Sequence, residues 1–391
     1  MTVGERRTRL GRRHRLAAET KASDPVEAAA GVVGLHSTDA ASVFVSAWAR
    51  MDDGDVAAVE QALYEDRTLL RVLAMRRTMF VAPVDAAVSM LAACSLAVAA
   101  GERRRLLSLI ETADLSGGDP EAWLAAAEAA ALDGLDRHDE ATAAELAGDD
   151  PYLSAVLVLG AGKKYEARQK VVSRVLTVLG AQGRAIRASP RGSWTSTQFR
   201  WALLDRWQPG AATRPQPEAA RADLARRWLG RFGPASVEDL RWWAGWTMGA
   251  TRKAVAANET VEVDLDGLPG LALAEDIGQE RAVAPWAALL PALDATTMGW
   301  KDRGWYLGDH GPLLFDGNGN ASPTVWWDGR VVGGWAQAPD GEIRFRLLED
   351  IGADAVEAVE GRAAELAARV GTAKLSPRAR GRSPVETELL A

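Results

Sequence analysis

The chain has 391 residues, of which 48% are apolar and 25% charged, and its formal net charge is −7 at pH 7. This balance is typical of a soluble globular protein and excludes a disordered chain. At this length we expect three or four compact units, each of which buries its own apolar face. The negative sum argues against a uniformly basic nucleic-acid-binding protein, but the distribution of Lys and Arg matters more than their total.

The single cysteine, Cys94, lies in an apolar run. An intrachain disulfide is therefore excluded, and a buried thiol in a cytosolic protein is expected. The arginines between positions 6 and 15 are not followed by an apolar segment of the kind found in secretory signals, and no apolar run is long enough to span a bilayer. We expect a cytoplasmic, nucleoid-associated protein without a membrane partner.

The first predicted unit, residues 1–119, consists of helices around an extended segment. Helices are predicted over 40–51, with Thr38 or Asp39 as the N-cap, over 56–65 and over 84–100. Residues 69–83 predict a turn into a short strand. This order is compatible with a winged helix unit.

The second predicted unit spans residues 120–212. It begins with an alanine-rich helix over 121–132 and a short helix over 142–147. A basic amphipathic helix over 164–179 and a ribbon over 185–206 follow, as a winged helix-turn-helix requires, with the basic helix as the recognition helix. The Pro- and Ala-rich residues 209–217 predict a linker.

The third predicted unit, residues 213–282, again combines helices with a strand pair. Helices are expected over 218–229, from Ser236 to 244, and from Thr247 or Thr251 to 257, and the strand pair over 261–265 and 271–274 forms a wing.

The last unit, residues 283–372, consists of short apolar runs between Gly, Asn and Asp turns, which predict a small β-barrel or sheet. A helix over 353–370 closes this unit, and residues 373–391 form a polar tail. The predicted fold class is therefore α+β, mainly α, with three tandem winged helix units followed by a C-terminal β-barrel-like unit.

Four segments carry a resemblance to a known family. They are Gly34-Leu35-His36-Ser37-Thr38-Asp39, Arg191-Gly192-Ser193-Trp194, residues 232–240 with Trp242-Trp243, and residues 289–294 leading to Asp302-Arg303. Their order and spacing resemble the AlkZ and YcaQ type of DNA glycosylases, a superfamily of tandem winged helix proteins. The resemblance implies a C-shaped monomer that cradles double-stranded DNA and excises an alkylated purine without a metal or cofactor.

The catalytic motif departs from the pattern of this family. Active members carry Gln, an apolar residue, and then Gln or Asp, where this chain has His36, Ser37 and Thr38. An N7-alkylated purine already bears a positive charge, so its departure requires mainly a held water and stabilisation of an oxocarbenium-like sugar. His36 is expected to orient or deprotonate that water, Thr38 to hydrogen-bond it, and Asp39 to supply negative charge. Alternatively, Thr38 or Asp39 only caps the helix that begins at residue 40, and His36 satisfies a backbone group.

Contacts to DNA are predicted from basic residues and from aromatic residues in ribbons. Trp194 and Trp305 each follow a Gly and an Arg, so their rings are candidates to press on a sugar or base, whereas core packing is expected for the other tryptophans. The basic candidates are Arg77, Lys163, Lys164, Arg168, Arg191 and Arg303.

Other kinds of site lack their required residues. The histidines at 14, 36, 138 and 310 show no i, i+4 pair, so zinc is not expected. Asp316, Asn318 and Asn320 begin like a calcium loop, but Ala321 and Trp327 replace the required Gly and Glu, so a hairpin turn is expected. A Gly-rich phosphate loop with its Lys does not occur, which argues against an ATPase.

Three functions from different classes remain open. The first is a monofunctional DNA glycosylase for bulky or cationic purine adducts, including cross-links. The second is a non-catalytic DNA-binding or regulatory protein, which the loss of both Gln positions favours. The third is a structural or interaction protein that does not bind DNA, which only the negative net charge supports. We favour the first because a regulator usually dimerises on a two-fold operator, whereas tandem modules in one chain suit a monomer that wraps DNA.

Overall fold

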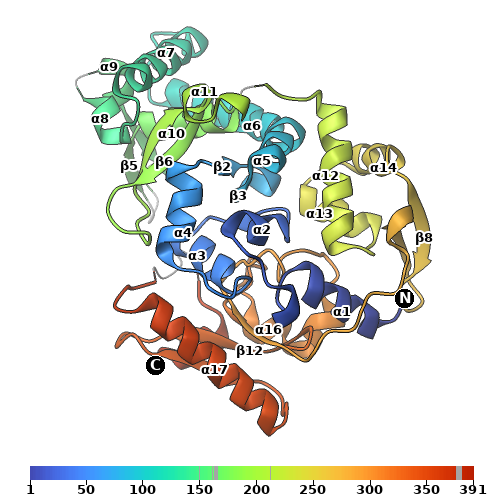
Figure 1. Cartoon of the computed structure of the whole chain (residues 1–391). Coiled ribbons are helices and arrows are strands. Elements are labelled where there is room, and N and C mark those ends of the chain that lie inside the picture. Colours follow the sequence, from blue (N-terminus) through green and yellow to red (C-terminus); the bar gives the residue numbers. More distant parts are fainter. Residues whose placement is uncertain (149, 161, 163–165, 212, 376–380) are drawn as a thin grey trace.

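The structure is a computed structural model that describes residues 1–148, 150–160, 162, 166–211, 213–375 and 381–391. In these residues, helices alternate with five small antiparallel sheets. Figure 1 shows α7 to α9 at one end of the molecule, the C-terminal sheet unit at the other, and α2, α3 and α4 between them. The fold is thus mixed α+β, as the sequence predicts.

The N-terminal segment builds a three-stranded sheet of order β1-β3-β2 within a layer of helices. The predicted helix over 40–51 is α3, and Asp39 is its N-cap. The predicted helices over 56–65 and 84–100 are confirmed as well. The elements are α1 (Val3–Arg13), α2 (Pro25–Ala30), β1 (Leu35–His36), α3 (Ala40–Trp48), α4 (Val56–Glu60) with a π-helical turn over Gln61–Glu65, β2 (Leu69–Leu73), β3 (Met79–Pro83), α5 (Val84–Met90) and α6 (Leu96–Thr112).

The second segment confirms the alanine-rich helix, the short helix capped by Thr142, and the ribbon over 185–206. Its elements are α7 (Pro120–His138), α8 (Ala143–Ala147), α9 (Pro151–Ser154), β4 (Val156–Leu159), β5 (Ala167–Lys170), α10 (Val172–Ala181), β6 (Ala185–Pro190), β7 (Phe199–Leu203) and α11 (Leu204–Trp207).

The predicted basic recognition helix over 164–179 is present only from residue 172 onwards, and residues 167–170 before it are a strand. Residues Ala167–Lys170 form strand β5, which pairs with β4 from Leu159↔Ala167 to Val156↔Lys170. The helix begins only at Val172, and most of its apolar side chains are buried in the core. Strand pairing with β4 is a contact that helical periodicity does not reveal, so Arg168 and Lys170 lie on a strand where the periodicity predicts a helix.

The third segment follows the prediction closely. Ser236 caps α13 with a capping box, Thr247 caps α14, and β8 pairs with β9 as a two-stranded wing. The elements are α12 (Pro217–Phe232), α13 (Val237–Ala244), α14 (Met248–Ala256), β8 (Thr260–Asp264) and β9 (Pro269–Leu273).

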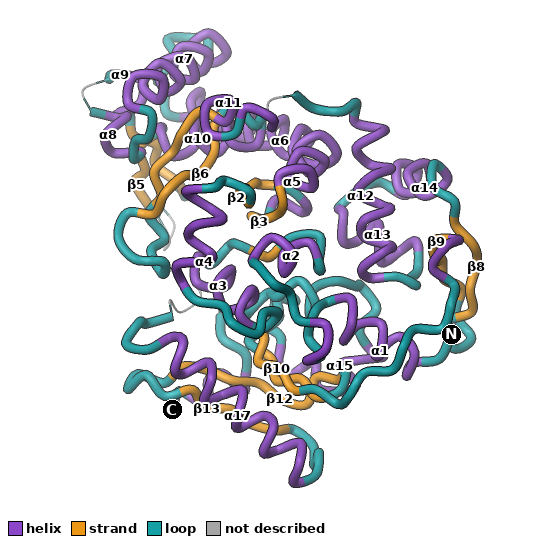
Figure 2. Tube along the Cα trace, viewed as in Figure 1, coloured by secondary structure: helices purple, strands orange, loops and turns teal. Residues whose placement is uncertain are grey.

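The described C-terminal strands form an open sheet, so the predicted barrel is corrected. Four antiparallel strands lie in the order β10-β11-β12-β13, and β10 and β13 remain as edges. Helix α17 packs along this sheet, as Figure 2 shows, and helices therefore bury the apolar surface that closure would otherwise bury. The elements are β10 (Ala287–Leu290), α15 (Gly304–Leu307), α16 (Gly311–Leu314), β11 (Thr324–Trp327), β12 (Arg330–Gln337), β13 (Ile343–Leu347), α17 (Ala353–Val370) and α18 (Pro384–Leu389). Helix α18 lies within the predicted polar tail, yet its Val385 is buried.

Two apolar cores run through the described residues, and this differs from the expected set of separately buried units. The larger core joins residues from all four segments of the chain. The smaller core joins the second half of α6 to α7 and α10. The continuous helix over Val84–Thr112 is long and apolar enough to cross a membrane, contrary to the sequence-based expectation. Its apolar window is 56% buried inside the protein, as in a core helix.

The basic N-terminal run is largely used in internal ion pairs. Arg13 contacts Asp276 at 2.6 Å and Glu280 at 2.9 Å, and Arg9 contacts Asp276 at 3.2 Å. These contacts hold α1 on the segment that follows β9, so the run is a structural feature of the fold.

A buried polar network holds α3 against the C-terminal unit. Arg50, just after α3, contacts Asp294 at 2.7 Å with both side chains 0% exposed. Ser46 also donates to Asp294, and Arg50 donates to Thr296 at 2.8 Å. His14 completes the network through a 2.8 Å contact between its Nδ1 and the hydroxyl of Thr296. The helix that follows the His36 motif is thereby fixed at its far end.

Candidate active site

The motif His36-Ser37-Thr38 lies where β1 ends and α3 begins. His36 is opposite Phe80 of β3, and the Ser37 N–H donates to the Met79 carbonyl at 2.8 Å. Gly34 fits closely before the strand, because a Cβ there would lie 3.0 Å from the Met90 methyl carbon and 3.2 Å from the Ala82 Cβ. Strand pairing on one side and the capped helix on the other therefore fix the backbone of the motif.

The imidazole of His36 is buried, with 5% exposure, and meets the Phe80 ring edge-on at 5.6 Å. Burial and the nearby positive charge of Arg76 lower the pKa of His36 to about 3. The ring is neutral at physiological pH and is a weak base. This differs from the expectation that His36 titrates near neutral pH and could take a proton from water.

Thr38 is exposed beside His36. Its hydroxyl lies 3.5 Å from Nε2 of His36, and its backbone N lies 3.5 Å from Nδ1. Contacts of this length are weak as direct hydrogen bonds. A water molecule shared between the Thr38 hydroxyl and the imidazole would satisfy both groups better.

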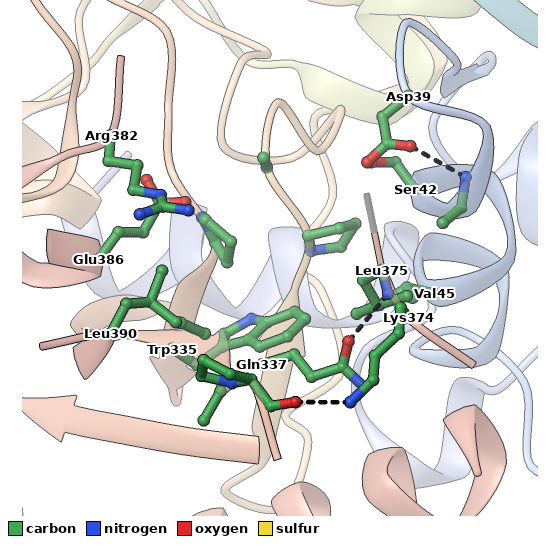
Figure 3. A pocket seen from close by; sticks show the side chains of 17 residues that line it. Asp39, Ser42, Val45, Trp335, Gln337, Lys374, Leu375, Arg382, Glu386 and Leu390 are labelled. Carbon is green, nitrogen blue, oxygen red and sulfur yellow. Dashed lines mark hydrogen bonds between the residues drawn. The ribbon is translucent and has the colours of Figure 1, made fainter. Parts of the chain in front are cut away.

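Asp39 caps α3, as the second interpretation of the motif predicts. Its carboxylate accepts from the Ala41 N–H at 3.2 Å. It also lines a cavity of about 250 Å³ between α3 and the C-terminal unit, where Figure 3 shows it above Gln337 and Lys374. Thr38 does not line this cavity. The structure thus brings His36 and Thr38 together but directs Asp39 towards a different cavity.

Thr38 lines a second cavity of about 280 Å³, which we call the arginine cavity. It lies between β2, the second half of α10 and the β6–β7 ribbon. The residues that define it here are Thr38, Arg71, Arg77, Thr177, Arg187 and Trp201.

Arg71 connects the arginine cavity to the motif. Its guanidinium is buried, with 3% exposure, and donates to the hydroxyls of Ser37 and, at 3.3 Å, Tyr64. Ser37, at the position where the resemblance implies an apolar residue, thus provides a buried arginine with a hydrogen-bond acceptor.

A further cationic group, the Arg76 guanidinium, lies near His36. Arg76 stacks over Trp242 at 3.9 Å, and Arg303 stacks over the same ring at 4.9 Å. Although part of the Arg76 side chain is solvent-exposed, crowding around its guanidinium and the charge of Arg303 lower its pKa to about 10. It remains charged at pH 7, so His36 lies in a positive environment.

Comparisons with known proteins identify the family of this chain. A family model described as DNA glycosylase AlkZ-like matches residues 29–369. The chain belongs to the AlkZ-like DNA glycosylase family. An interstrand DNA cross-link repair glycosylase of Streptomyces sahachiroi is 30% identical over 175 residues, which are 42% of this chain and 46% of that protein. The match thus spans about half the length of the curated relative.

A solved structure extends the likeness to nearly the whole fold. The DNA glycosylase AlkZ of Streptomyces sahachiroi superposes with a TM-score of 0.72 at 21% identity, covering 96% of this chain and 98% of that chain. At this identity the likeness concerns the fold.

The basic residues that were predicted to contact DNA lie in different environments in this AlkZ-like chain. Arg191 is exposed at the β6–β7 turn, and Arg168 is exposed on β5. Arg77 is ion-paired with Glu102, and Arg303 is half-buried between Trp242 and Phe315. Lys163 and Lys164 lie outside the described residues.

Both tryptophans that were predicted to contact DNA are buried in the structure. Trp194 is 9% exposed and packs against Phe44 at 5.1 Å and Trp48 at 5.3 Å. Trp305 is also buried and stacks against Arg6 at 4.1 Å. Both rings form part of the core. Trp194 lies between β6 and β7, where contacts with a distant segment cover it, and Trp305 lies in helix α15 and not in a ribbon.

We predict that Trp194→Ala destabilises the protein by about 3 kcal/mol, because it leaves a cavity beside Phe44 and Trp48. Urea denaturation measures this change. The matched substitution Arg191→Gln on the same ribbon is exposed and should change stability by less than about 0.5 kcal/mol. Equal stability of the Trp194→Ala protein and wild type would contradict the core position of this ring.

The two buried histidines predict acid instability. Burial and the charge of Arg50 lower the pKa of His14 from its ordinary value of 6.5 to about 3. Burial and the charge of Arg76 lower the pKa of His36 to about 3 as well. Below pH 6.5 the unfolded chain therefore binds protons that the folded protein does not, so stability falls as pH falls towards 3. Each histidine contributes a slope of up to about 1.4 kcal/mol per pH unit.

Urea denaturation at a series of pH values between 7 and 4.5 measures this slope. His14→Gln should roughly halve it, whatever its effect on absolute stability. A slope that His14→Gln leaves unchanged would show that His14 is protonated in the folded protein.

The described residues offer no candidate metal site. Across the residues that the structure describes, no group of three or more His, Cys, Asp or Glu could hold a metal ion. Residues 316–320 form the predicted turn, in which Asp316 accepts from Asn318 N–H at 2.9 Å and Asn320 N–H at 3.0 Å. Cys94 is a buried thiol, as predicted, and burial raises its pKa to about 12.

Sequence reasoning did not identify Arg71, Arg76 or Arg187 as part of this site. Arg71 interrupts the apolar strand β2, which is otherwise Leu and Val. A charged residue inside a buried strand is unusual, and this was the one available signal. The placement of Arg76 and Arg187 depends on contacts between distant segments.

Proposed function

We propose that this protein is a monofunctional DNA glycosylase that hydrolyses the bond between deoxyribose and an N7-alkylated purine. Membership of the AlkZ-like family supports a DNA glycosylase. The observation that carries the finer proposal is the pair formed by neutral His36 and exposed Thr38, of which Thr38 lines the arginine cavity. This pair is suited to hold one water molecule.

The chemistry needs little acid catalysis. As the C1′–N9 bond breaks, its electron pair goes to the purine, which already carries the positive charge of the alkyl group and leaves neutral. The water oxygen then bonds to C1′ and releases a proton. His36 and Thr38 orient this water. The carboxylate of Asp39 caps α3 and lines the other cavity, so its negative charge acts on the oxocarbenium-like sugar only at long range. The proton passes to solvent, because the low pKa of His36 makes it a poor acceptor.

The surrounding fold supports DNA as the partner. Three segments of the chain each combine helices with a strand pair or small sheet: β2–β3, β6–β7 and β8–β9. We assign them as tandem winged helix units that bind duplex DNA as a monomer, with Arg191 at one wing tip. The named relative acts on interstrand cross-links, so cross-linked and bulky adducts belong among the substrates to be tested.

A single-turnover excision assay tests the proposal. Duplex oligonucleotides with one N7-methylguanine, one bulky N7 adduct or one interstrand N7 cross-link are incubated with excess protein, and alkaline cleavage reveals abasic sites. Excision of any of these substrates, above a control with undamaged duplex, is the expected result. Absence of excision on all three would overturn the proposal.

The second candidate is a non-catalytic DNA-binding protein. The specific observation in its favour is the low pKa of His36, which removes the general base that the sequence had indicated. Duplex binding that weakens with salt, without excision of any adduct, would establish this alternative.

A further inference from the structure

The arginine cavity is lined by the guanidinium groups of Arg71 and Arg187, for which the described residues provide no counter-charge. Arg71 and Arg187 both stack on Phe199, at 4.6 Å and 5.7 Å. Within the described part of the chain, neither forms an ion pair, and the Nε of Arg71 has no hydrogen-bond partner although it is buried. Buried like charges are costly unless an anion neutralises them.

Among the described residues, Arg187 likewise has a positively charged neighbour and no negatively charged one. Burial and the charge of Arg71 lower the pKa of Arg187 to about 10, and among the described residues no carboxylate offsets this effect. The Arg187 guanidinium also lies over the Trp201 ring, 5.5 Å from its centroid. The other arginine of the cavity, Arg77, is already paired with Glu102. Arg71 and Arg187 are thus the two groups that an incoming anion would meet.

The charge of the cavity also decides which part of the substrate fits. An N7-alkylated purine is cationic, and two unpaired guanidiniums would repel it. A DNA phosphodiester is anionic, and arginine is the side chain that best matches its oxygens. Thr38 lines the same cavity, so the bound phosphate is close to the nucleotide at which water attacks.

We infer that Arg71 and Arg187 form a binding site for one DNA phosphodiester that flanks the damaged nucleotide. This inference rests on the proposed function for the position of the lesion, but not on catalysis. The site draws the backbone into the cavity between β2 and the β6–β7 ribbon and thereby aligns the sugar with His36 and Thr38. It provides positioning and leaves the chemistry to the motif.

A thermodynamic cycle that combines an arginine substitution with replacement of single phosphates by an uncharged analogue tests this site. The probe is duplex DNA with an uncleavable tetrahydrofuran abasic analogue, in which each phosphate near the analogue is replaced in turn by an uncharged methylphosphonate. One replacement should weaken binding by the wild type about tenfold. The same replacement should have almost no further effect on Arg187→Gln, whose affinity for the all-phosphate duplex is already reduced to a similar extent.

Two other variants act as controls. Arg187→Lys keeps the charge and should retain part of the sensitivity to that one phosphate. Arg344→Gln removes an arginine that is ion-paired with Asp340 on the C-terminal sheet, and its effect should add to that of every methylphosphonate. Urea denaturation of each variant confirms that it is folded.

The outcomes separate this inference from the proposed function. Additive effects of Arg187→Gln at every phosphate would overturn the phosphate site, even if the wild type excises adducts. Loss of additivity at one phosphate would establish the site, even in a protein without excision activity. A site for free inorganic phosphate would show no dependence on the position of the methylphosphonate and would also overturn the inference.

Discussion

His36→Ala is expected to lower the single-turnover excision rate about a hundredfold, because it removes one of the two groups that position the attacking water. His36→Gln should retain most of the rate. A glutamine amide, like a neutral imidazole, both donates and accepts a hydrogen bond, and Gln is the residue that the family pattern has at this position. The measurement is the excision assay with N7-methylguanine duplex, with duplex affinity determined in parallel.

The pH dependence distinguishes positioning from general-base catalysis. Because the pKa of His36 is lowered to about 3, protonation of this ring should cause no loss of rate between pH 8 and pH 5. A rate that falls with an apparent pKa near 6.5 and becomes pH-independent in His36→Gln would instead make His36 a general base.

Asp39→Asn separates the two roles of Asp39. Asparagine caps helices about as well as aspartate, so this variant should keep the stability of α3 while removing the negative charge. A slower excision rate at unchanged stability would support an electrostatic contribution, and an unchanged rate would leave Asp39 as a helix cap.

Asp294→Ala is expected to destabilise the protein by about 3 to 5 kcal/mol, because it leaves the buried Arg50 guanidinium without its counter-charge. Ser46 and Thr296 would remain as neutral partners, but they do not neutralise the charge. The measurement is the free energy of unfolding in urea at pH 7. Since the network fixes the end of α3, excision should fall in the same variant.

Two controls make this prediction specific. The double variant Arg50→Met with Asp294→Leu removes both charges and should be more stable than Asp294→Ala alone. Asp340→Ala breaks the exposed pair with Arg344 and should cost less than about 1 kcal/mol. Equal effects of Asp294→Ala and Asp340→Ala would mean that the Arg50–Asp294 pair is not buried in solution.

The stability that the Arg50–Asp294 pair contributes also depends on pH. Burial opposes ionisation of Asp294, but Arg50 and the hydrogen bonds from Ser46 and Thr296 outweigh it and lower the pKa of Asp294. The stability that this pair contributes is therefore complete above the ordinary pKa of an aspartate, about 3.9. It is lost only as pH falls further, so the effect of the two histidines appears first on acidification.

The sequence by itself determined the elements whose signals are local. Asp39, Ser236 and Thr247 cap the helices predicted for them, and the ribbon broken at Pro190 and the helix over 353–370 occur where expected. These features depend on hydrogen bonds and dihedral preferences among residues a few positions apart. A single chain therefore shows them without an alignment. The family resemblance came from short motifs in a fixed order, and the family is confirmed.

Only the tertiary structure decided the environment of the candidate site. Strand β5 replaces part of a predicted basic helix because it pairs with β4, and Trp194 is buried because α3 packs against it. Arg50 meets Asp294 from 244 positions away in the sequence, and the arginine cavity is formed by β2, α10 and the β6–β7 ribbon. Burial lowers the pKa of His36 and that of Arg187, which has no carboxylate partner among the described residues. Burial depends on which distant segments pack together.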